Sequence, residues 1–368
     1  MKRNFIAWIG CFLTIAFVGG LIFCTAGPAM AKEKVYRWKL QAAAPSVNPD
    51  YQALKRFVEK VKIASNGRLI IRTYSAGALT KGAGMWDGVQ DGITEMAMGW
   101  TTWYHGKIPG LALVTGGPFH FMNLDASMMY YFEGEGGKIV NEWTKPFGIM
   151  WRPSWFAGME FGILANFPVK GLDDLKGKKI RMGPGLPADV LIEAAGCYAE
   201  PTVPQEIYES LQRGVLDGVE WTTPSGSWPM KFHEVTTHVI APAVWQPDVM
   251  GDFLINEKAY NKLPKDLQQI LEMAMKDFTL DATLSAKILD METLDKFKET
   301  GMIVNKWSDE DLVRWKEATA RVYERYCTKY PTFKRLYESS MKFKEKYNNY
   351  YDTFKAYEGG ESIPYKVK

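Results

Sequence analysis

Apolar and polar positions follow two different periods along the first part of the chain. Residues 35–40 alternate apolar and charged side chains, and residues 69–74 are rich in strand-forming residues after an Asn-Gly turn, so both segments are predicted strands. Between them, apolar residues of segment 51–64 fall at helical spacing. A short helix at 87–94 and a strand at 96–98 are expected next. The alternation of strands and helices predicts an α/β sheet.

The same alternation restarts after residue 148. Segment 148–165 is rich in strand formers, and strands are predicted at 179–182 and 216–221. Helices are predicted at 187–195, where Pro187 suits the first turn, and at 205–214, where Gly214 suits the stop. Two α/β units with a cleft between them are the simplest interpretation.

The segment 265–300 contains neither Pro nor Gly, and its apolar residues fall mostly three and four positions apart. A helix of this length spans roughly 54 Å at ~1.5 Å per residue, more than the width of a small lobe. We therefore expect it to run along both units. Aromatic residues recur after Pro331, which predicts a last helix. Its aromatic face either packs on its own lobe or docks on a second subunit.

The N-terminus has the pattern of a secretory signal. Lys2 and Arg3 precede an apolar segment at 5–24, and Ala29-Met30-Ala31 forms an A-x-A cleavage signal. We expect residues 1–31 to be a signal peptide; an uncleaved anchor is the alternative, because about 20 apolar residues can span a membrane. Cys197 and Cys327 then remain, and an oxidising compartment permits either a bridge or two independent thiols.

Composition narrows the function classes. The chain is 46% apolar and 24% charged, which supports a folded core and argues against disorder. Its 45 basic and 42 acidic residues are interleaved, so no nucleic-acid footprint is expected. Four His and four Cys leave little material for a site built mainly from these residues.

Two charged residues at strand ends are the candidate chemistry. Arg181 ends a predicted strand immediately before a Gly-Pro-Gly loop, where a guanidinium fork suits carboxylate binding. Glu220 ends an apolar strand beside Trp221, where a buried charge needs a partner or a metal ion. The residues alone leave two other interpretations open: a surface Arg paired with an acid, and a solvated strand end.

Three ordered motifs resemble those of a known family: Trp103-Tyr104-His105-Gly106-Lys107-Ile108-Pro109, the segment from Leu172 to Arg181, and the segment from Gly214 to Trp221. The chain resembles the solute-binding proteins of tripartite ATP-independent periplasmic (TRAP) transporters over essentially its whole mature length. The resemblance is closest to the branch that binds 2-oxo acids and lactate.

The resemblance implies a two-lobed, periplasmic binding protein-like α/β fold with a long lobe-spanning helix and an extra C-terminal helix. Lobe I would comprise 32–158 plus 247–286, and lobe II 159–246 plus 287–330 with the connecting helix. The C-terminal helix, 331–368, would exchange between the subunits of a homodimer.

The resemblance also implies the site. Arg181 would bind the substrate carboxylate. In the metal-using branch of the family, a Gln side chain, a Glu carboxylate and the carbonyl group of the next Trp hold a cation. Glu220 and Trp221 match the last two, whereas this chain has Glu160 at the position of the Gln. Two carboxylates, one guanidinium and a monocarboxylate ligand sum to −2, which a divalent cation neutralises. We therefore expect Ca²⁺ rather than Na⁺. If Glu160 is protonated or points away, this argument fails.

Large rings would shape the rest of the pocket, and the candidates are Trp100, Trp103, Tyr104, Phe161 and Trp245. They would admit a ligand with an apolar or aromatic substituent. The expected function is a periplasmic receptor that captures a 2-oxo or 2-hydroxy monocarboxylate and delivers it to the membrane subunits of a TRAP transporter. The alternatives are a secreted metal-dependent enzyme acting on 2-oxo acids and a ligand sensor for a membrane partner.

Overall fold

The computed structural model describes residues 33–358, with side chains up to residue 353. The expected signal peptide and the final residues, 359–368, lie outside the described part. No helix in the described part contains a stretch long and apolar enough to cross a membrane.

The first sheet has five strands in the order β2-β1-β3-β10-β4. β1 pairs in parallel with β2 and β3, whereas β10 is antiparallel to both of its neighbours. The strand bounds are Tyr36–Ala42 (β1), Leu69–Tyr74 (β2), Met96–Gly99 (β3), Ile149–Gly158 (β4) and Val249–Asn256 (β10).

The second sheet has six strands in the order β11-β9-β5-β8-β6-β7. β5 is antiparallel to β8 and β9, and the other pairs are parallel. The bounds are Ile163–Ala165 (β5), Lys179–Arg181 (β6), Tyr198–Glu200 (β7), Gly218–Glu220 (β8), His238–Ala241 (β9) and Ile303–Lys306 (β11). Two mixed sheets with surrounding helices confirm the predicted α/β fold.

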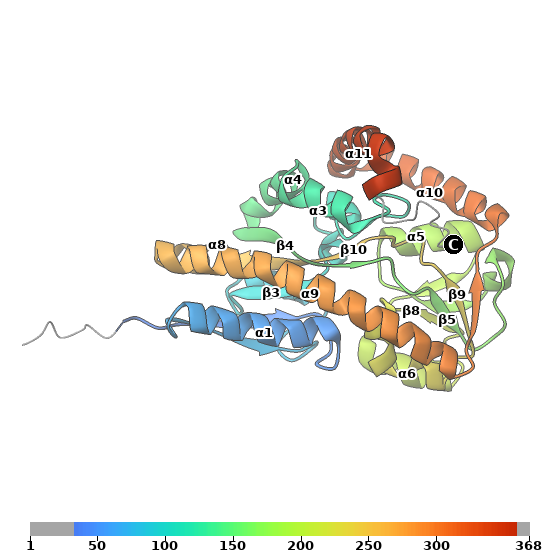
Figure 1. Ribbon diagram of the computed structural model, residues 1–368, viewed down its shortest axis with the longest axis horizontal. Coiled ribbons are helices and arrows are strands. Elements are labelled where there is room, and N and C mark those ends of the chain that lie inside the picture. Colours follow the sequence, from blue (N-terminus) through green and yellow to red (C-terminus); the bar gives the residue numbers. More distant parts are fainter. Residues whose placement is uncertain (1–32, 359–368) are drawn as a thin grey trace, which may run out of the picture. The chain divides into compact units, whose positions relative to one another are not determined.

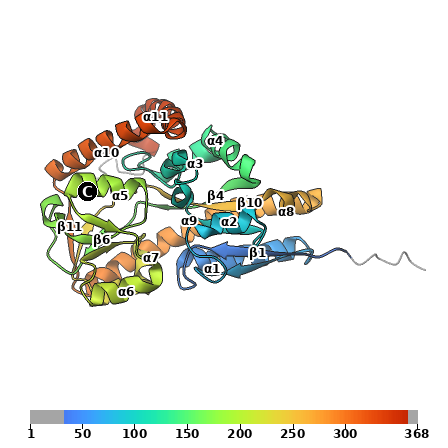
Figure 2. The ribbon, with the colours of Figure 1, turned by 180° about the vertical axis from the view of Figure 1, so that it is seen from behind.

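Eleven α-helices lie in the described part of the chain (Figures 1 and 2). They are α1 (Pro49–Ala64), α2 (Gly84–Gln90), α3 (Leu124–Phe132), α4 (Gly136–Thr144), α5 (Leu186–Ala195), α6 (Pro204–Gln212), α7 (Pro224–Ser227), α8 (Glu257–Asn261), α9 (Lys265–Glu299), α10 (Asp309–Lys329) and α11 (Pro331–Glu358).

The long helix α9 packs against elements of both sheets, as its length predicts. It contacts α1 and β4 beside the first sheet and α7 beside the second. Figure 1 shows it running from α8 to the neighbourhood of α6. Phe278 packs on Phe57 and Phe253 in the core of the first sheet, and Phe297 packs on Phe161 in the core of the second.

The chain crosses between the sheets in two short segments, 159–162 after β4 and 242–248 before β10. These crossovers run close together: the backbone N–H of Glu160 donates to the carbonyl oxygen of Gln246 at 3.4 Å, and that of Ala243 donates to the carbonyl oxygen of Glu160 at 3.5 Å. Gly162 has a φ of 143°, and a Cβ there would lie 2.1 Å from the carbonyl oxygen of Ile240. Only glycine fits this position, because any side chain would clash with the neighbouring backbone. The lobe boundaries stay a prediction.

The C-terminal helices pack on the chain's own body. α10 contacts α5, and α11 contacts α3, α4 and the short 3₁₀ helix η2 (Pro109–Leu113). The Phe343 ring lies 5.4 Å from that of Tyr130. Cys197 is buried, Cys327 is partly buried, and both are free thiols.

Candidate ligand-binding site

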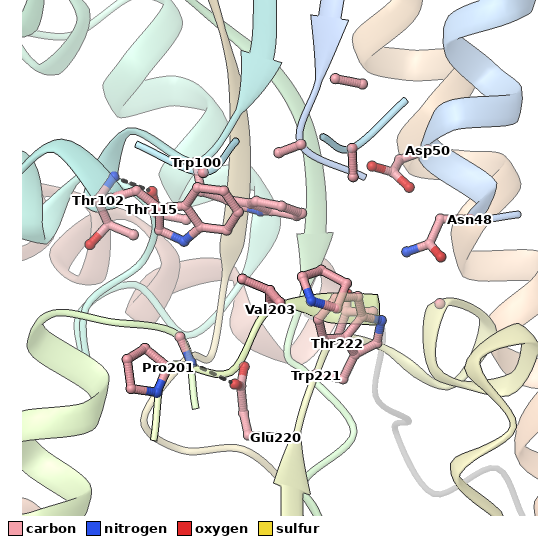
Figure 3. A pocket seen from close by; sticks show the side chains of 18 of the residues that line it. Asn48, Asp50, Trp100, Thr102, Thr115, Pro201, Val203, Glu220, Trp221 and Thr222 are labelled. Atoms are coloured by element: carbon pink, nitrogen blue, oxygen red, sulfur yellow. Dashed lines mark hydrogen bonds between the residues drawn. The ribbon is translucent and has the colours of Figure 1, made fainter. Parts of the chain in front are cut away.

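A cavity of about 550 Å³ is lined by residues from both sheets and from the first crossover. Four indole side chains contribute to its walls: Trp100, Trp103, Trp155 and Trp221. Figure 3 shows the side chains of Trp100 and Trp221 at this cavity, with Glu220 at the end of strand β8. A concave, mostly apolar space with a few converging polar groups is the usual form of a small-molecule site.

Arg181 and Glu220 meet because their strands are parallel neighbours. β6 and β8 pair in parallel, with Arg181 opposite Val219, so both charged residues lie at the carboxyl ends of their strands. Ligand sites of open α/β sheets typically lie outside this edge. The parallel pairing therefore brings the two charged residues to one edge of the sheet.

Arg181 is only 6% exposed and is held on two sides. Its Nη1 donates to the carbonyl oxygen of Glu220 at 2.8 Å and to the Glu220 Oε2 at 3.1 Å, and its Nε donates to the Thr202 carbonyl at 3.3 Å. Its guanidinium carbon lies 4.7 Å from the centroid of the Trp221 ring. Burial lowers the pKa of Arg181, while the two nearby glutamates oppose that shift.

Nη2 of Arg181 donates no hydrogen bond to any of the described residues. A guanidinium carries five N–H donors in a planar fork. This leaves Nη2 available for a carboxylate in the cavity that Arg181 lines.

Glu220 is 2% exposed and has the partner that its buried position requires. Its Oε2 accepts from Arg181 and, at 3.1 Å, from the backbone N–H of Gly183 in the Gly-Pro-Gly loop. The alternative of a solvated strand end is therefore excluded. The other interpretation of Arg181 was a surface arginine paired with an acid. The guanidinium is indeed paired with an acid, but the pair is buried.

Glu160 places a second carboxyl group beside Glu220. It lies in the first crossover, is 5% exposed, and its Oε2 has no hydrogen-bond partner among the described residues. Burial raises the pKa of Glu160 well above its usual value, and the neighbouring Glu220 carboxylate raises it further by charge repulsion. Arg181 offsets part of this shift.

These groups fit a bound cation. Two facing carboxyl groups, one with an unpartnered buried oxygen, supply the hard oxygen donors that Ca²⁺ and Na⁺ require. Among the described residues no group of three or more His, Cys, Asp or Glu side chains could hold a metal ion. A cation here would therefore also need backbone or ligand oxygens.

The structure separates the predicted aromatic residues into two groups. Trp100, Trp103 and Trp221 line the cavity. Tyr104, Phe161 and Trp245 do not, because their rings fill hydrophobic cores. Their ring centroids lie 5.2 Å from Trp86, 4.9 Å from Phe297 and 5.3 Å from Trp315, respectively.

Several lining residues had no sequence signal for binding. Asn48 and Asp50 flank Pro49 at the start of α1, a pattern that indicates a helix start and nothing more. Trp155 lies within β4, and Gln246 lies in the second crossover. Their approach to the cavity depends on tertiary packing.

Comparison with known proteins identifies the family. Residues 40–329 match the model for DctP, bacterial extracellular solute-binding protein, family 7. A monocarboxylate 2-oxoacid-binding periplasmic protein of Nostoc is 27% identical over 309 residues, which cover 84% of each chain.

Two solved structures agree with this assignment. A TRAP periplasmic solute-binding protein from Colwellia psychrerythraea with bound calcium and pyruvate aligns with a TM-score of 0.81 at 27% identity, covering 87% of this chain and 97% of that one. A second, from Pseudoalteromonas atlantica with bound sodium and pyruvate, aligns with a TM-score of 0.81 at 25% identity, covering 89% and 100%.

A two-sheet fold with a cavity lined from both sheets is the architecture of a solute receptor. The chain belongs to the DctP family of TRAP solute-binding proteins. Members of this family are binding proteins rather than enzymes, which sets aside the alternative of a secreted metal-dependent enzyme.

Proposed function

We propose that this protein captures a small monocarboxylate of the 2-oxo or 2-hydroxy class in the cavity between its two sheets. The observation that carries the proposal is the buried group of Arg181, Glu220 and Glu160 at that cavity. Relatives that bind 2-oxo acids support the same ligand class. In this proposal the protein binds its ligand without making or breaking a covalent bond.

In this proposal Arg181 pairs with the ligand carboxylate through its available N–H groups. Glu160, Glu220 and the carbonyl oxygen of Trp221 hold a cation, which supplies positive charge to the ligand's oxygens. Burial favours the protonated form of Glu160 in the cation-free site, so a bound cation has to displace that proton. With Glu160 ionised, the charges of Glu160, Glu220, Arg181 and a monocarboxylate sum to −2, so Ca²⁺ brings the closed site to neutrality whereas Na⁺ leaves −1. Uncompensated buried charge is costly, which favours Ca²⁺.

The cavity has room for more than a three-carbon acid. Its volume of about 550 Å³ lies within the roughly 300–1,000 Å³ range of small-molecule pockets. The indole rings of Trp100, Trp103 and Trp155 offer apolar surface to a substituent on the acid. We therefore include 2-oxo acids with apolar or aromatic side chains in the proposed substrate class.

Ligand capture at a boundary between two lobes stabilises the arrangement in which both lobes touch the ligand. The 159–162 and 242–248 crossovers and α9 connect the two sheets and would bend during that closure. We propose that the closed form acts in the periplasm, where it delivers the acid to the membrane subunits of a TRAP transporter. A homodimer that includes the C-terminal helix is part of the proposal.

Thermal unfolding of metal-stripped protein tests the ligand class and the cation together. Pyruvate, phenylpyruvate and lactate are each added with Ca²⁺, with Na⁺ or with neither. A ligand at ~100 times its Kd stabilises the protein by about 2.7 kcal/mol, which shifts the melting temperature measurably. We expect a shift for 2-oxo acids that requires Ca²⁺. Absence of any shift with all these acids contradicts the proposed ligand class.

A further inference from the structure

A second polar region of the cavity lies at the N-terminus of α1. Asn48 and Asp50 are only 3% and 4% exposed, and both line the cavity. Figure 3 shows their side chains on the far side of Trp221 and Thr222 from Glu220. These two residues come from the start of α1, whereas Arg181 and Glu220 come from β6 and β8, so they form a second polar group of the cavity.

The side chain of Asn48 does not cap α1. It occupies the N-cap position of α1, where Asn commonly accepts a hydrogen bond from the first turn, yet its side chain makes no such bond. Its Oδ1 has no hydrogen-bond partner among the described residues. A buried carbonyl oxygen without a partner is destabilising, and a ligand donor would remove that cost.

Asp50 adds a second oxygen acceptor to the same region. Burial raises the pKa of Asp50 to about 7, and hydrogen bonds from the backbone amides of Tyr51 and Asp50 offset only part of that shift. Asp50 thus has a role at the helix start, but its carboxyl group still lies at the cavity. The two side chains present acceptor oxygens and, through Nδ2 of Asn48, two N–H donors.

A hydroxyl group matches this set, because it donates to an oxygen and accepts from an amide N–H. Apolar surface from the indole rings lies elsewhere on the cavity wall. We propose that Asn48 and Asp50 form a specificity subsite for a hydroxyl group at the far end of the ligand, so that the preferred substrate is a hydroxylated 2-oxo or 2-hydroxy monocarboxylate. This inference rests on the proposed function.

Two matched pairs of acids test the subsite by titration calorimetry in saturating Ca²⁺. One pair is para-hydroxyphenylpyruvate and phenylpyruvate; the other is 2-oxopentanoate and its terminally hydroxylated derivative. We expect the hydroxylated acid to bind at least about tenfold more tightly in one pair or both, since a hydrogen bond to a buried acceptor has this magnitude.

Two variants assign that preference to the subsite. Asn48→Ala and Asp50→Ala should each reduce it severalfold or more, while pyruvate affinity stays within about twofold and reports an intact Arg181 region. Asn123→Ala is the matched control, because Asn123 is the N-cap of α3 and does not line the cavity. This variant should retain the full preference.

The possible outcomes separate the two proposals. Equal affinities within both pairs overturn the subsite while leaving the receptor proposal intact. A preference that survives in both Asn48→Ala and Asp50→Ala also overturns it. Failure of pyruvate and all four other acids to bind the wild-type protein overturns the proposed function and the subsite with it.

Discussion

Replacing Glu160 with Gln tests why the site would need a divalent ion. In the wild-type protein two buried carboxyl groups face each other, and the pKa of Glu160 is raised first by burial and then by Glu220. Glu160→Gln removes the negative charge that Glu160 carries once a cation displaces its proton, while nearly preserving the shape of the side chain. The summed charge of the liganded site then changes from −2 to −1.

The magnitude follows from Coulomb's law. One unit charge at ~4 Å from another contributes about 4 kcal/mol at an effective dielectric constant near 20. The cation also loses hydration on entering the site, so the measured change is smaller than this gross value. We expect Ca²⁺ affinity to fall by about 1.5–3 kcal/mol, or roughly ten- to hundredfold, and the preference for Ca²⁺ over Na⁺ to narrow.

Calorimetry of metal-stripped protein with Ca²⁺ or Na⁺, at a fixed pyruvate concentration, measures both quantities. Glu206→Gln is the matched control, because Glu206 lines the same cavity but is exposed. This control should change Ca²⁺ affinity by less than about threefold, as expected for a solvent-screened charge. Wild-type binding that depends on Na⁺ alone, with Glu160→Gln indistinguishable from wild type, would refute the charge argument.

Three further predictions concern ligand capture, pH and the C-terminal helix. Arg181→Ala should reduce acid affinity more than a hundredfold, as measured by calorimetry. It should also lower the free energy of unfolding in urea by about 3–5 kcal/mol, because it leaves Glu220 buried without its partner. An acid affinity equal to that of the wild type would exclude Arg181 from the site. Burial raises the pKa of Asp248 to about 8, so the folded protein binds a proton that the unfolded chain releases near pH 4, and this contribution to stability is lost as pH rises toward 8. Asp248→Asn should therefore flatten the fall in urea-unfolding free energy between pH 5 and pH 8, by at most about 1.4 kcal/mol per pH unit, and an unchanged slope would contradict this. Phe333→Ala should lower the free energy of unfolding by about 3–5 kcal/mol, because Phe333 is fully buried. Met341→Ala, on the exposed side of α11, should change it by less than about 0.5 kcal/mol. Equal changes in the two variants would show that α11 is not docked on its own chain.

Strong local periodicity made most of the fold predictable. The helix at 51–64, the strand at 69–74 and the long helix at 265–300 all form close to their expected bounds, since their apolar residues repeat over several turns or alternate along a strand. The helix expected at 87–94 is wrong in position. α2 spans Gly84–Gln90 instead, and Gly92, with a φ of 73°, lies in the turn that follows.

The charged part of the site was predictable, but its walls were not. Arg181 and Glu220 each end a strand next to distinctive residues, and a parallel pairing brings such ends together. The aromatic candidates had no comparable constraint. Tyr104 and Trp103 are adjacent in the chain, yet one ring packs in a core and the other lines the cavity, a difference that only tertiary packing decides. In the sequence, Asn48 and Asp50 look like ordinary helix-start residues, because their approach to the cavity also depends on tertiary packing.

A crystal structure of the protein with pyruvate and Ca²⁺, with anomalous data to locate the ion, tests the central claim most directly. The account predicts that the ligand carboxylate lies within hydrogen-bond distance of the Arg181 guanidinium. It also predicts an ion in contact with Glu160, Glu220 and the carbonyl oxygen of Trp221, at the 2.3–2.6 Å typical of Ca²⁺. A pyruvate bound away from Arg181, or an ion bound away from both glutamates, would contradict it.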